Sequence, residues 1–267
     1  MEVAHFTQTF ALGGERTDKP FTITVVDDLG REVEIPYPPK RVAATVSFQV
    51  ELLMTLGYRP VLRPNIPEQY IFPPEAKEIP TVQISHRAGP NLEQLAAAEP
   101  DLVITSPTFA QFVPSIEETL GVPVLVYDIA GFDDVVEKIR TFGLLVGRQA
   151  EAEEVAADLQ AQLTALRQGL PEEGPRVFAL FGTSESFLGF MPDSYLGNLV
   201  ELLGGQLITR GDEPHQRFRT FTPFSLETVV ARDPDIIFIV RHGAPSPERE
   251  ENIEELQQDP AWSSITA

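Results

Sequence analysis

The chain has 267 residues and a formal net charge of −20, from 20 Lys and Arg against 40 Asp and Glu. This length accommodates one large domain or two ordinary domains. The acidic charge argues against a nucleic-acid-binding protein and against docking on an anionic membrane surface, because both need basic residues. Without cysteine, the chain forms no disulfide, thiolate metal site or cysteine nucleophile. No apolar run approaches the length of a membrane-spanning helix.

The first half of the chain predicts an α/β lobe at residues 22–131, preceded by a polar tail at 1–21. Residues 22–35 predict a β-hairpin with its turn at 27–30. After it, short apolar runs alternate with helical patterns, which is typical of a parallel sheet covered on both faces. The expected strands are 41–46, 102–105 and 122–126, and the expected helices are 50–56, 92–98 and 114–120.

The second half predicts a helical connector at residues 132–171 and a second α/β lobe at 172–267. Residues 150–170 are rich in Ala, Glu, Gln and Leu and predict one long helix, which stops at Pro171. Strands and helices then alternate again, and whether this lobe is truncated is left open. The predicted fold class is α/β: two Rossmann-like lobes joined by one long α-helix, with a ligand cleft between them. The expected elements after the connector are strands 176–181, 187–191 and 236–240 and a helix at 195–203.

An internal repeat supports two lobes. Residues 91–104 align with residues 225–238, and five of the fourteen positions are identical. Asn91 and Ser225 are favourable helix N-caps. Glu93 and Glu227 then fall in the first turn, where a carboxylate meets the positive end of the helix dipole. Each copy continues through Pro-Asp into an apolar strand, so the repeat predicts the same helix–strand module in each lobe.

The repeat also predicts where a ligand binds, because ligands of open α/β sheets lie beyond the carboxyl ends of the strands. Three predicted strand ends carry an arginine. Arginines that converge in an acidic protein indicate an anionic ligand, and surface ion pairs are the alternative. The candidate ligand-binding residues at strand ends are Arg63, Arg87, Arg241, Ser47, Gln49, Ser106, Thr108 and Tyr127.

Two of the four histidines, His86 and His242, follow predicted strands and are candidate metal ligands, since imidazole is the commonest metal ligand. The sequence contains no tight cluster of three or four ligands. His215 lies in a polar loop and is expected to be exposed and without a functional role. There is no dinucleotide-binding glycine motif, no Walker lysine loop and no serine elbow. A two-lobed Rossmann-type enzyme such as a transferase remains the alternative to a binding protein.

Three motifs resemble a known family. They are Val-Asp-Asp-Leu-Gly-Arg-Glu-Val and Pro-Pro-Lys-Arg-Val within residues 22–42, the repeated Leu-Glu…Pro-Asp blocks, and the block from Tyr195 to Gly205. Together they resemble the substrate-binding proteins of ABC importers for ferric siderophores, haem and cobalamin, over residues 22–267. The resemblance implies two α/β lobes joined by one rigid helix. It also implies a periplasmic or extracellular location, with a lipid anchor left open for the native form.

The resemblance assigns roles to individual residues. Glu93 and Glu227 match the acidic residues that dock on permease arginines. His242 matches the haem-ligating histidine of haem-binding members, whereas their first-lobe methionine corresponds here to about Ala88, so His86 is the substitute. In siderophore-binding members converging arginines hold the ligand, a role that Arg63, Arg87 and Arg241 fit.

The resulting hypothesis is an extracytoplasmic solute-binding protein that captures an iron complex and delivers it to an ABC permease without catalysis. The iron chelate, a ferric siderophore or haem, is the transported ligand, and no cofactor of the protein's own is expected. We expect a monomer that binds no nucleic acid. Aromatic side chains are expected to cover the flat faces of the chelate, namely Phe190, Tyr195 and Tyr127. The alternatives are a cobalamin-binding protein of the same family and the two-lobed enzyme.

Overall fold

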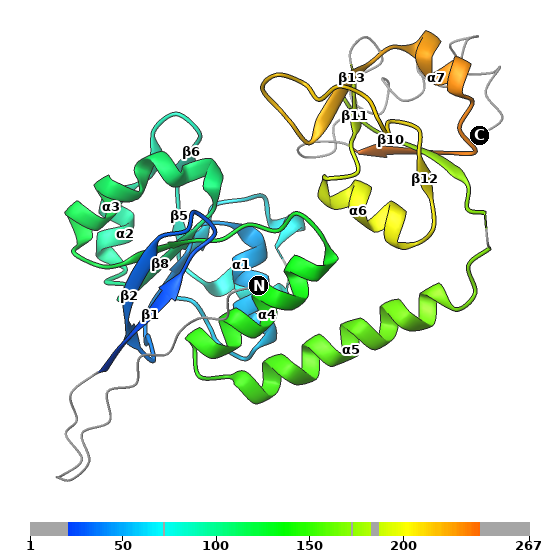
Figure 1. Ribbon diagram of the computed structural model, residues 1–267. Helices are drawn as coiled ribbons and strands as arrows, with labels where there is room; N and C mark the ends of the chain where they lie inside the picture. Colours follow the sequence, from blue (N-terminus) through cyan, green and yellow to red (C-terminus); the bar gives the residue numbers. More distant parts are fainter. Residues whose placement is uncertain (1–20, 72, 172, 183–186, 241–267) are drawn as a thin grey trace. The chain divides into compact units, whose positions relative to one another are not determined.

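The computed structural model describes residues 21–71, 73–171, 173–182 and 187–240 (Figure 1). The chain divides into two compact units: unit 1 comprises Met1–Asp128 and Val136–Ala157, and unit 2 comprises Ile129–Val135 and Asp158–Ala267. Helix α4 (Phe132–Leu145) therefore begins in unit 2 and continues in unit 1, and α5 (Gln149–Arg167) begins in unit 1 and ends in unit 2. Each unit is described by itself below.

Unit 1 is built on a parallel sheet in the order β3-β8-β9, with β3 at Val42–Ala44, β8 at Leu102–Thr105 and β9 at Val124–Val126. Every residue of the three strands is buried. Continuous apolar strands of this kind occur where helices cover both faces of a sheet. The predicted parallel arrangement is confirmed, although β3 is shorter than the expected strand at 41–46.

Helices cover both faces of this sheet. On one face Leu95 of α2 and Ile116 of α3 join a buried cluster with Ala43 and Val103. Figure 1 shows α1 and α4 against the other face. The three helices predicted for this region are all present, with bounds within a few residues of those expected: α1 is Ser47–Thr55, α2 is Leu92–Ala97 and α3 is Val113–Leu120.

The predicted hairpin is present, and its turn is fastened to the sheet. Asp27 is buried, and its carboxylate accepts hydrogen bonds from Leu29 N (3.0 Å) and Arg31 N (3.0 Å) within the turn. The same carboxylate accepts from Val126 N (3.2 Å) at the end of β9. The Asp-Asp-Leu-Gly-Arg motif therefore holds the hairpin against the parallel sheet. Its strands are β1 (Phe21–Val26) and β2 (Glu32–Tyr37), paired antiparallel.

Short strands and 3-10 helices complete unit 1, and the predicted strand ends at Arg63 and Arg87 fall among them. These elements connect α1 to α2 and β8 to α3, and the first of them follows Leu62, which bridges to Ala43 of β3. These elements are β4 (Arg63–Pro64), β5 (Thr81–Val82), β6 (Ile84–Ser85), β7 (Gly89–Pro90) and the 3-10 helices η1 (Glu68–Tyr70), η2 (Pro74–Glu78) and η3 (Pro107–Phe112).

Unit 2 contains a mixed five-stranded sheet, in which β10 pairs parallel with β12 and β14 but antiparallel with β11, and β11 pairs antiparallel with β13. The antiparallel pairs depart from the parallel sheet that alternation with helices suggests. A parallel pair needs a crossover of a dozen or more residues, and β10 and β11 are too close in sequence for one. The elements are β10 (Arg176–Gly182), β11 (Phe187–Phe190), α6 (Tyr195–Leu202), β12 (Gln206–Leu207), β13 (Phe221–Phe224), α7 (Leu226–Arg232) and β14 (Ile236–Val240).

The internal repeat corresponds to a repeated set of hydrogen bonds. In unit 1 the Asp101 carboxylate accepts from Arg41 N at 2.9 Å, and Asp101 N donates to Arg41 O at 2.9 Å. In unit 2 the Asp235 carboxylate accepts from Arg176 N at 2.7 Å, and Asp235 N donates to Arg176 O at 2.8 Å. Each arginine side chain also donates to the backbone at the end of the helix that leads into the Pro-Asp pair, which is α2 in unit 1 and α7 in unit 2. The Pro-Asp pair therefore joins helix, strand and neighbouring strand in the same way in both units.

The block that begins at Tyr195 has a glycine at position 197 because a side chain there would meet the backbone. A Cβ at this position would lie 2.0 Å from Met191 O and 2.9 Å from Ser194 Oγ. Ser194 caps α6 by accepting from Gly197 N at 3.0 Å, so the start of the helix is closed tightly over its own cap. Among the helices that the structure describes, none has the length and apolar character needed to cross a membrane.

Candidate functional site

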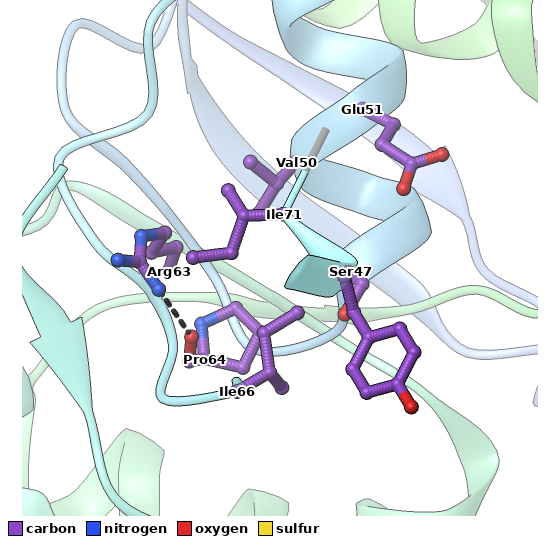
Figure 2. A pocket seen from close by; sticks show the side chains of 8 residues that line it. Ser47, Val50, Glu51, Arg63, Pro64, Ile66 and Ile71 are labelled. Atoms are coloured by element: carbon purple, nitrogen blue, oxygen red, sulfur yellow. Dashed lines mark hydrogen bonds between the residues drawn. The ribbon is translucent and has the colours of Figure 1, made fainter. Parts of the chain in front are cut away.

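A pocket in unit 1 lies where β3 and β4 end (Figure 2). The hollow is shallow and partly open to solvent, with room for about one water molecule between its walls. Two of the predicted ligand-binding residues line it: Ser47, the first residue of α1, and Arg63 of β4. The lining residues are Ser47, Val50, Glu51, Arg63, Pro64, Ile66, Tyr70 and Ile71.

Arg63 is buried in the wall of this pocket, with only 7% of its surface exposed. Its Nε donates to Ala76 O at 2.9 Å, its Nη1 to Pro64 O at 3.1 Å and its Nη2 to Lys77 O at 3.2 Å. Figure 2 shows the bond to Pro64. Three of the five guanidinium N–H groups are thus occupied: two hold η2 against β4, and the third bonds to the neighbouring residue within β4. No carboxylate among the described residues forms an ion pair with Arg63.

The remainder of the pocket is apolar apart from one carboxylate. Val50 and Ile71 are buried, and Tyr70 stands beside them with an exposed fraction of 42%. Glu51 lies on the side of the pocket opposite Arg63 (Figure 2), and burial raises the pKa of its carboxyl group. Such a wall suits an apolar part of a ligand better than an anionic part. Glu51 and Tyr70 are not among the residues predicted from the sequence, because neither directly follows a predicted strand.

Two other predicted ligand-binding residues, Gln49 and Ser106, are buried outside the pocket lining. Gln49 Nε2 donates to Thr105 O at 2.7 Å, which ties α1 to the end of β8. Thr45 Oγ1 donates to Thr105 Oγ1 at 2.8 Å in the same cluster. Gln49 Oε1 has no hydrogen-bond partner among the described residues. In this structure these side chains join the elements that carry the pocket rather than lining it.

The hairpin of β6 and β7 and helix η3 bring three predicted residues to one exposed patch. His86, Arg87 and Thr108 are exposed, and the His86 ring stacks on Phe109 with ring centroids 5.6 Å apart. Ser85 Oγ accepts from Arg87 N at 3.2 Å and stabilises the tip of the hairpin. The patch presents an imidazole and a guanidinium to solvent, as expected for residues that contact a ligand.

Tyr127 is the predicted aromatic residue that the structure places in the core. Its exposed fraction is 2%, and its ring contacts Phe142 with centroids 5.7 Å apart. Lys138 Nζ lies 5.0 Å from the ring centroid and pairs with Asp28 at 2.6 Å. Burial, followed by the negative charges of Asp28, Asp27 and Glu137, raises the pKa of the Tyr127 hydroxyl. A ligand does not reach this ring without rearrangement of the core.

In unit 2 the two predicted aromatic residues lie at the end of β11 and at the start of α6. Tyr195, at the start of α6, has an exposed fraction of 46%. Phe190 packs against Phe221 with centroids 4.7 Å apart, so the end of β11 and the start of β13 share an aromatic contact. Met191 N donates to Thr220 O at 3.0 Å, which connects this aromatic pair to the loop before β13.

That loop, residues 211–220, presents Arg217, Phe218 and Arg219 side by side on the surface of unit 2. The Phe218 ring is 47% exposed, and the Arg217 guanidinium lies 5.3 Å from its centroid. Neither Arg217 nor Arg219 has an ion-pair partner among the described residues, whereas Arg210 pairs with Glu201 and Arg232 with Asp212. An unpaired guanidinium beside an exposed ring, with a second exposed arginine next to it in the sequence, is suited to a planar anion. The signal available in the sequence was Arg-Phe-Arg within an acidic chain.

Arg241 and His242 lie outside the described residues, so the structure gives no account of them. Within the part of the chain that the structure describes, no group of three or more His, Cys, Asp or Glu is placed to hold a metal ion.

Glu93 and Glu227 occupy matching positions in the two units. Each is exposed in the first turn of its helix, behind an N-cap that accepts from the backbone: Asn91 from Gln94 N at 3.0 Å and Ser225 from Thr228 N at 3.3 Å. The backbone N–H of Glu227 itself and the hydroxyl of Ser225 lower the pKa of the Glu227 carboxyl group. Both carboxylates are available to a partner.

Comparison with known proteins agrees with this architecture. The High-affinity heme uptake system protein IsdE of Staphylococcus aureus (strain Newman) is 24% identical over 231 residues, which are 86% of this chain and 74% of that protein. The structure of Staphylococcus aureus SirA complexed with staphyloferrin B superposes with a TM-score of 0.74 at 18% identity, covering 92% of this chain and 86% of that one. The periplasmic catecholate-siderophore binding protein VctP from Vibrio cholerae gives a TM-score of 0.76 at 15% identity, covering 92% and 88%.

These structural likenesses show that the fold is shared with solute-binding proteins. Residues 42–267 match the family described as Periplasmic binding protein, which is most of the chain. The chain therefore belongs to the periplasmic binding protein family.

Proposed function

We propose that this protein captures an iron complex, a ferric siderophore or haem, outside the cytoplasm and delivers it to an ABC permease. The observation that carries the proposal is the family match over residues 42–267, together with relatives whose names specify heme, staphyloferrin B and a catecholate siderophore. The role is one of binding rather than catalysis. The protein would work extracytoplasmically, with α5 as a rigid link between its two lobes.

The site chemistry supports a ligand with both apolar and anionic parts. The unit 1 pocket offers Val50, Ile71 and Tyr70, whereas the unit 2 loop offers the exposed Arg217 and Arg219 and the Phe218 ring that Arg217 contacts. Haem combines a flat apolar macrocycle with propionates, and catecholate chelates combine aromatic rings with anionic oxygens. Cobalamin fits less well, because its uncharged periphery has no use for unpaired arginines.

The test is an absorption spectrum of the purified protein before and after addition of haemin or a ferric catecholate complex. Saturable binding of either probe at micromolar concentration or below supports the proposal, and binding of neither contradicts it. If the ligand is haem, His242→Ala is expected to abolish the Soret shift, whereas His86→Ala changes the spin state and retains binding. If the ligand is a saturated ferric siderophore, loss of His242 costs about ten-fold in affinity.

A further inference from the structure

His215 is the centre of the exposed loop in unit 2. Its Nδ1 accepts two hydrogen bonds, from Arg217 N and from Phe218 N, both at 3.1 Å. Its own backbone N–H donates to Phe221 O at 2.7 Å. A single side chain therefore fixes two backbone amides that would otherwise have no partner within the loop, in the manner of an Asn or Asp side chain in an Asx turn.

The same imidazole also orients the Phe218 side chain. The two rings stack with centroids 5.3 Å apart and planes at 20°. The Arg217 guanidinium lies 5.3 Å from the Phe218 ring centroid, so Phe218 contacts both the histidine and the arginine. Without His215, Phe218 and Arg217 would have to be ordered by the ligand on binding, at a cost in conformational entropy.

The rest of the loop is closed by bonds that do not involve the His215 side chain. Thr222 Oγ1 donates to Glu213 O at 2.8 Å, and Phe221 N donates to Phe218 O at 2.9 Å. Thr222 is buried in β13, so the base of the loop belongs to the sheet of unit 2. The His215 imidazole is therefore placed to govern the tip of the loop while the sheet beneath it keeps its own contacts.

We propose that His215 is a positioning residue, whose Nδ1 acceptor pre-organises Arg217 and Phe218 to receive the planar anionic part of the ligand. The inference rests on the proposed function and adds to it a residue that does not itself need to touch the ligand. The essential property is the acceptor at Nδ1, and ring stacking is secondary. The sequence had suggested an exposed histidine without a role.

Two substitutions separate the acceptor from the ring. His215→Asn keeps an acceptor in nearly the same place and removes the ring, because Asn Oδ1 forms the same turn. His215→Phe keeps a ring that stacks on Phe218 and removes the acceptor. Gln216→Ala, which alters an exposed neighbour in the same loop, is the matched control. Affinity is measured by titration with haemin and with a ferric catecholate complex, and stability by thermal unfolding.

We expect His215→Phe to weaken binding of the probe about ten-fold, because the ligand must then order the tip of the loop on binding, whereas His215→Asn and Gln216→Ala bind as the wild type does. The amides of residues 217 and 218 should exchange with solvent several-fold faster in His215→Phe alone, as measured by NMR. All variants should unfold at similar temperatures. Equal affinity of His215→Phe and wild type would overturn the inference alone, whereas a wild type that binds neither probe would overturn the proposed function and this inference with it.

Discussion

Arg63 of unit 1 and Arg217 of unit 2 show two opposite uses of arginine in this protein. Arg63 of unit 1 is buried and donates to three backbone carbonyls, so its guanidinium is part of the pocket wall. Arg217 of unit 2 lies on the surface, with its guanidinium over an exposed phenylalanine ring and no ion-pair partner among the described residues. An arginine therefore stabilises the fold when backbone carbonyls already occupy its donors, and it is free for a ligand when they do not.

The largest effect on stability is expected from Arg63→Ala. It removes the Arg63 donors to Pro64 O and Lys77 O and one of two donors to Ala76 O, which keeps its bond from Ile79 N at 3.0 Å, and should lower the free energy of unfolding by about 3 kcal/mol. The measurement is urea unfolding followed by far-UV circular dichroism. Arg59→Ala is the control, because the Arg59–Glu78 pair is exposed at 3.6 Å and should contribute less than about 1 kcal/mol. An equal loss of unfolding free energy in the two variants would show that Arg63 has no special structural role.

The double variant Arg217→Ala, Arg219→Ala is expected to lose ligand affinity while keeping its stability. Loss of two charge-assisted contacts should weaken binding of haemin or a ferric catecholate complex by roughly 10–100-fold, and the loss should shrink as salt is raised. The free energy of unfolding should change by no more than about 0.5 kcal/mol, since both side chains are exposed. Arg210→Ala, in the same unit but paired with Glu201, is the control. Unchanged affinity in the double variant would show that this loop does not contact the ligand.

Substitution of Glu93 and Glu227 tests whether each unit contributes one docking residue for the permease. We expect Glu93→Ala and Glu227→Ala each to reduce uptake of the iron complex partially and the double variant to reduce it further, because exposed ion pairs are individually weak. Ligand affinity should stay unchanged, as both carboxylates stand on helix starts outside the unit 1 pocket and the unit 2 loop. Glu118→Ala, in α3, is the control for loss of one acidic side chain. Normal uptake by the double variant would exclude the docking role.

The smallest effect is expected at Glu51. Since burial raises its pKa, the folded state binds the proton more tightly than the unfolded state does. Its contribution to stability is therefore complete at low pH and falls as the pH rises through the raised pKa. Glu51→Gln should be more stable than wild type at about pH 7 and equal to it at about pH 3, as measured by urea unfolding at each pH. Glu154→Gln, on the exposed surface of α5, should show no such difference. A Glu51→Gln variant that is less stable at neutral pH would show that the carboxylate has a partner it needs.

Local sequence determined most of the secondary structure. The strands at 102–105 and 236–240 have the bounds that their apolar runs predict, and the repeat predicted both Asn91 and Ser225 as N-caps. The turn of the hairpin was predictable for the same reason, because Asp27 and Gly30 provide within a few residues the acceptor and the conformation that the turn needs. Family membership followed from such short motifs at fixed positions.

Tertiary structure alone decided which candidate residues are available to a ligand. Arg63 is covered because η2, more than ten residues further along the chain, folds back over it, and Tyr127 is covered because α4 packs on its ring. No periodic pattern in the sequence encodes either contact. Arg217 and Phe218 stay at the surface because β11 and β13 pair at the base of their loop, which lifts its tip away from the sheet. A predicted strand end indicates where along the chain a candidate side chain lies. Whether that side chain is buried depends on segments that are distant in sequence and pack against it only in the folded protein.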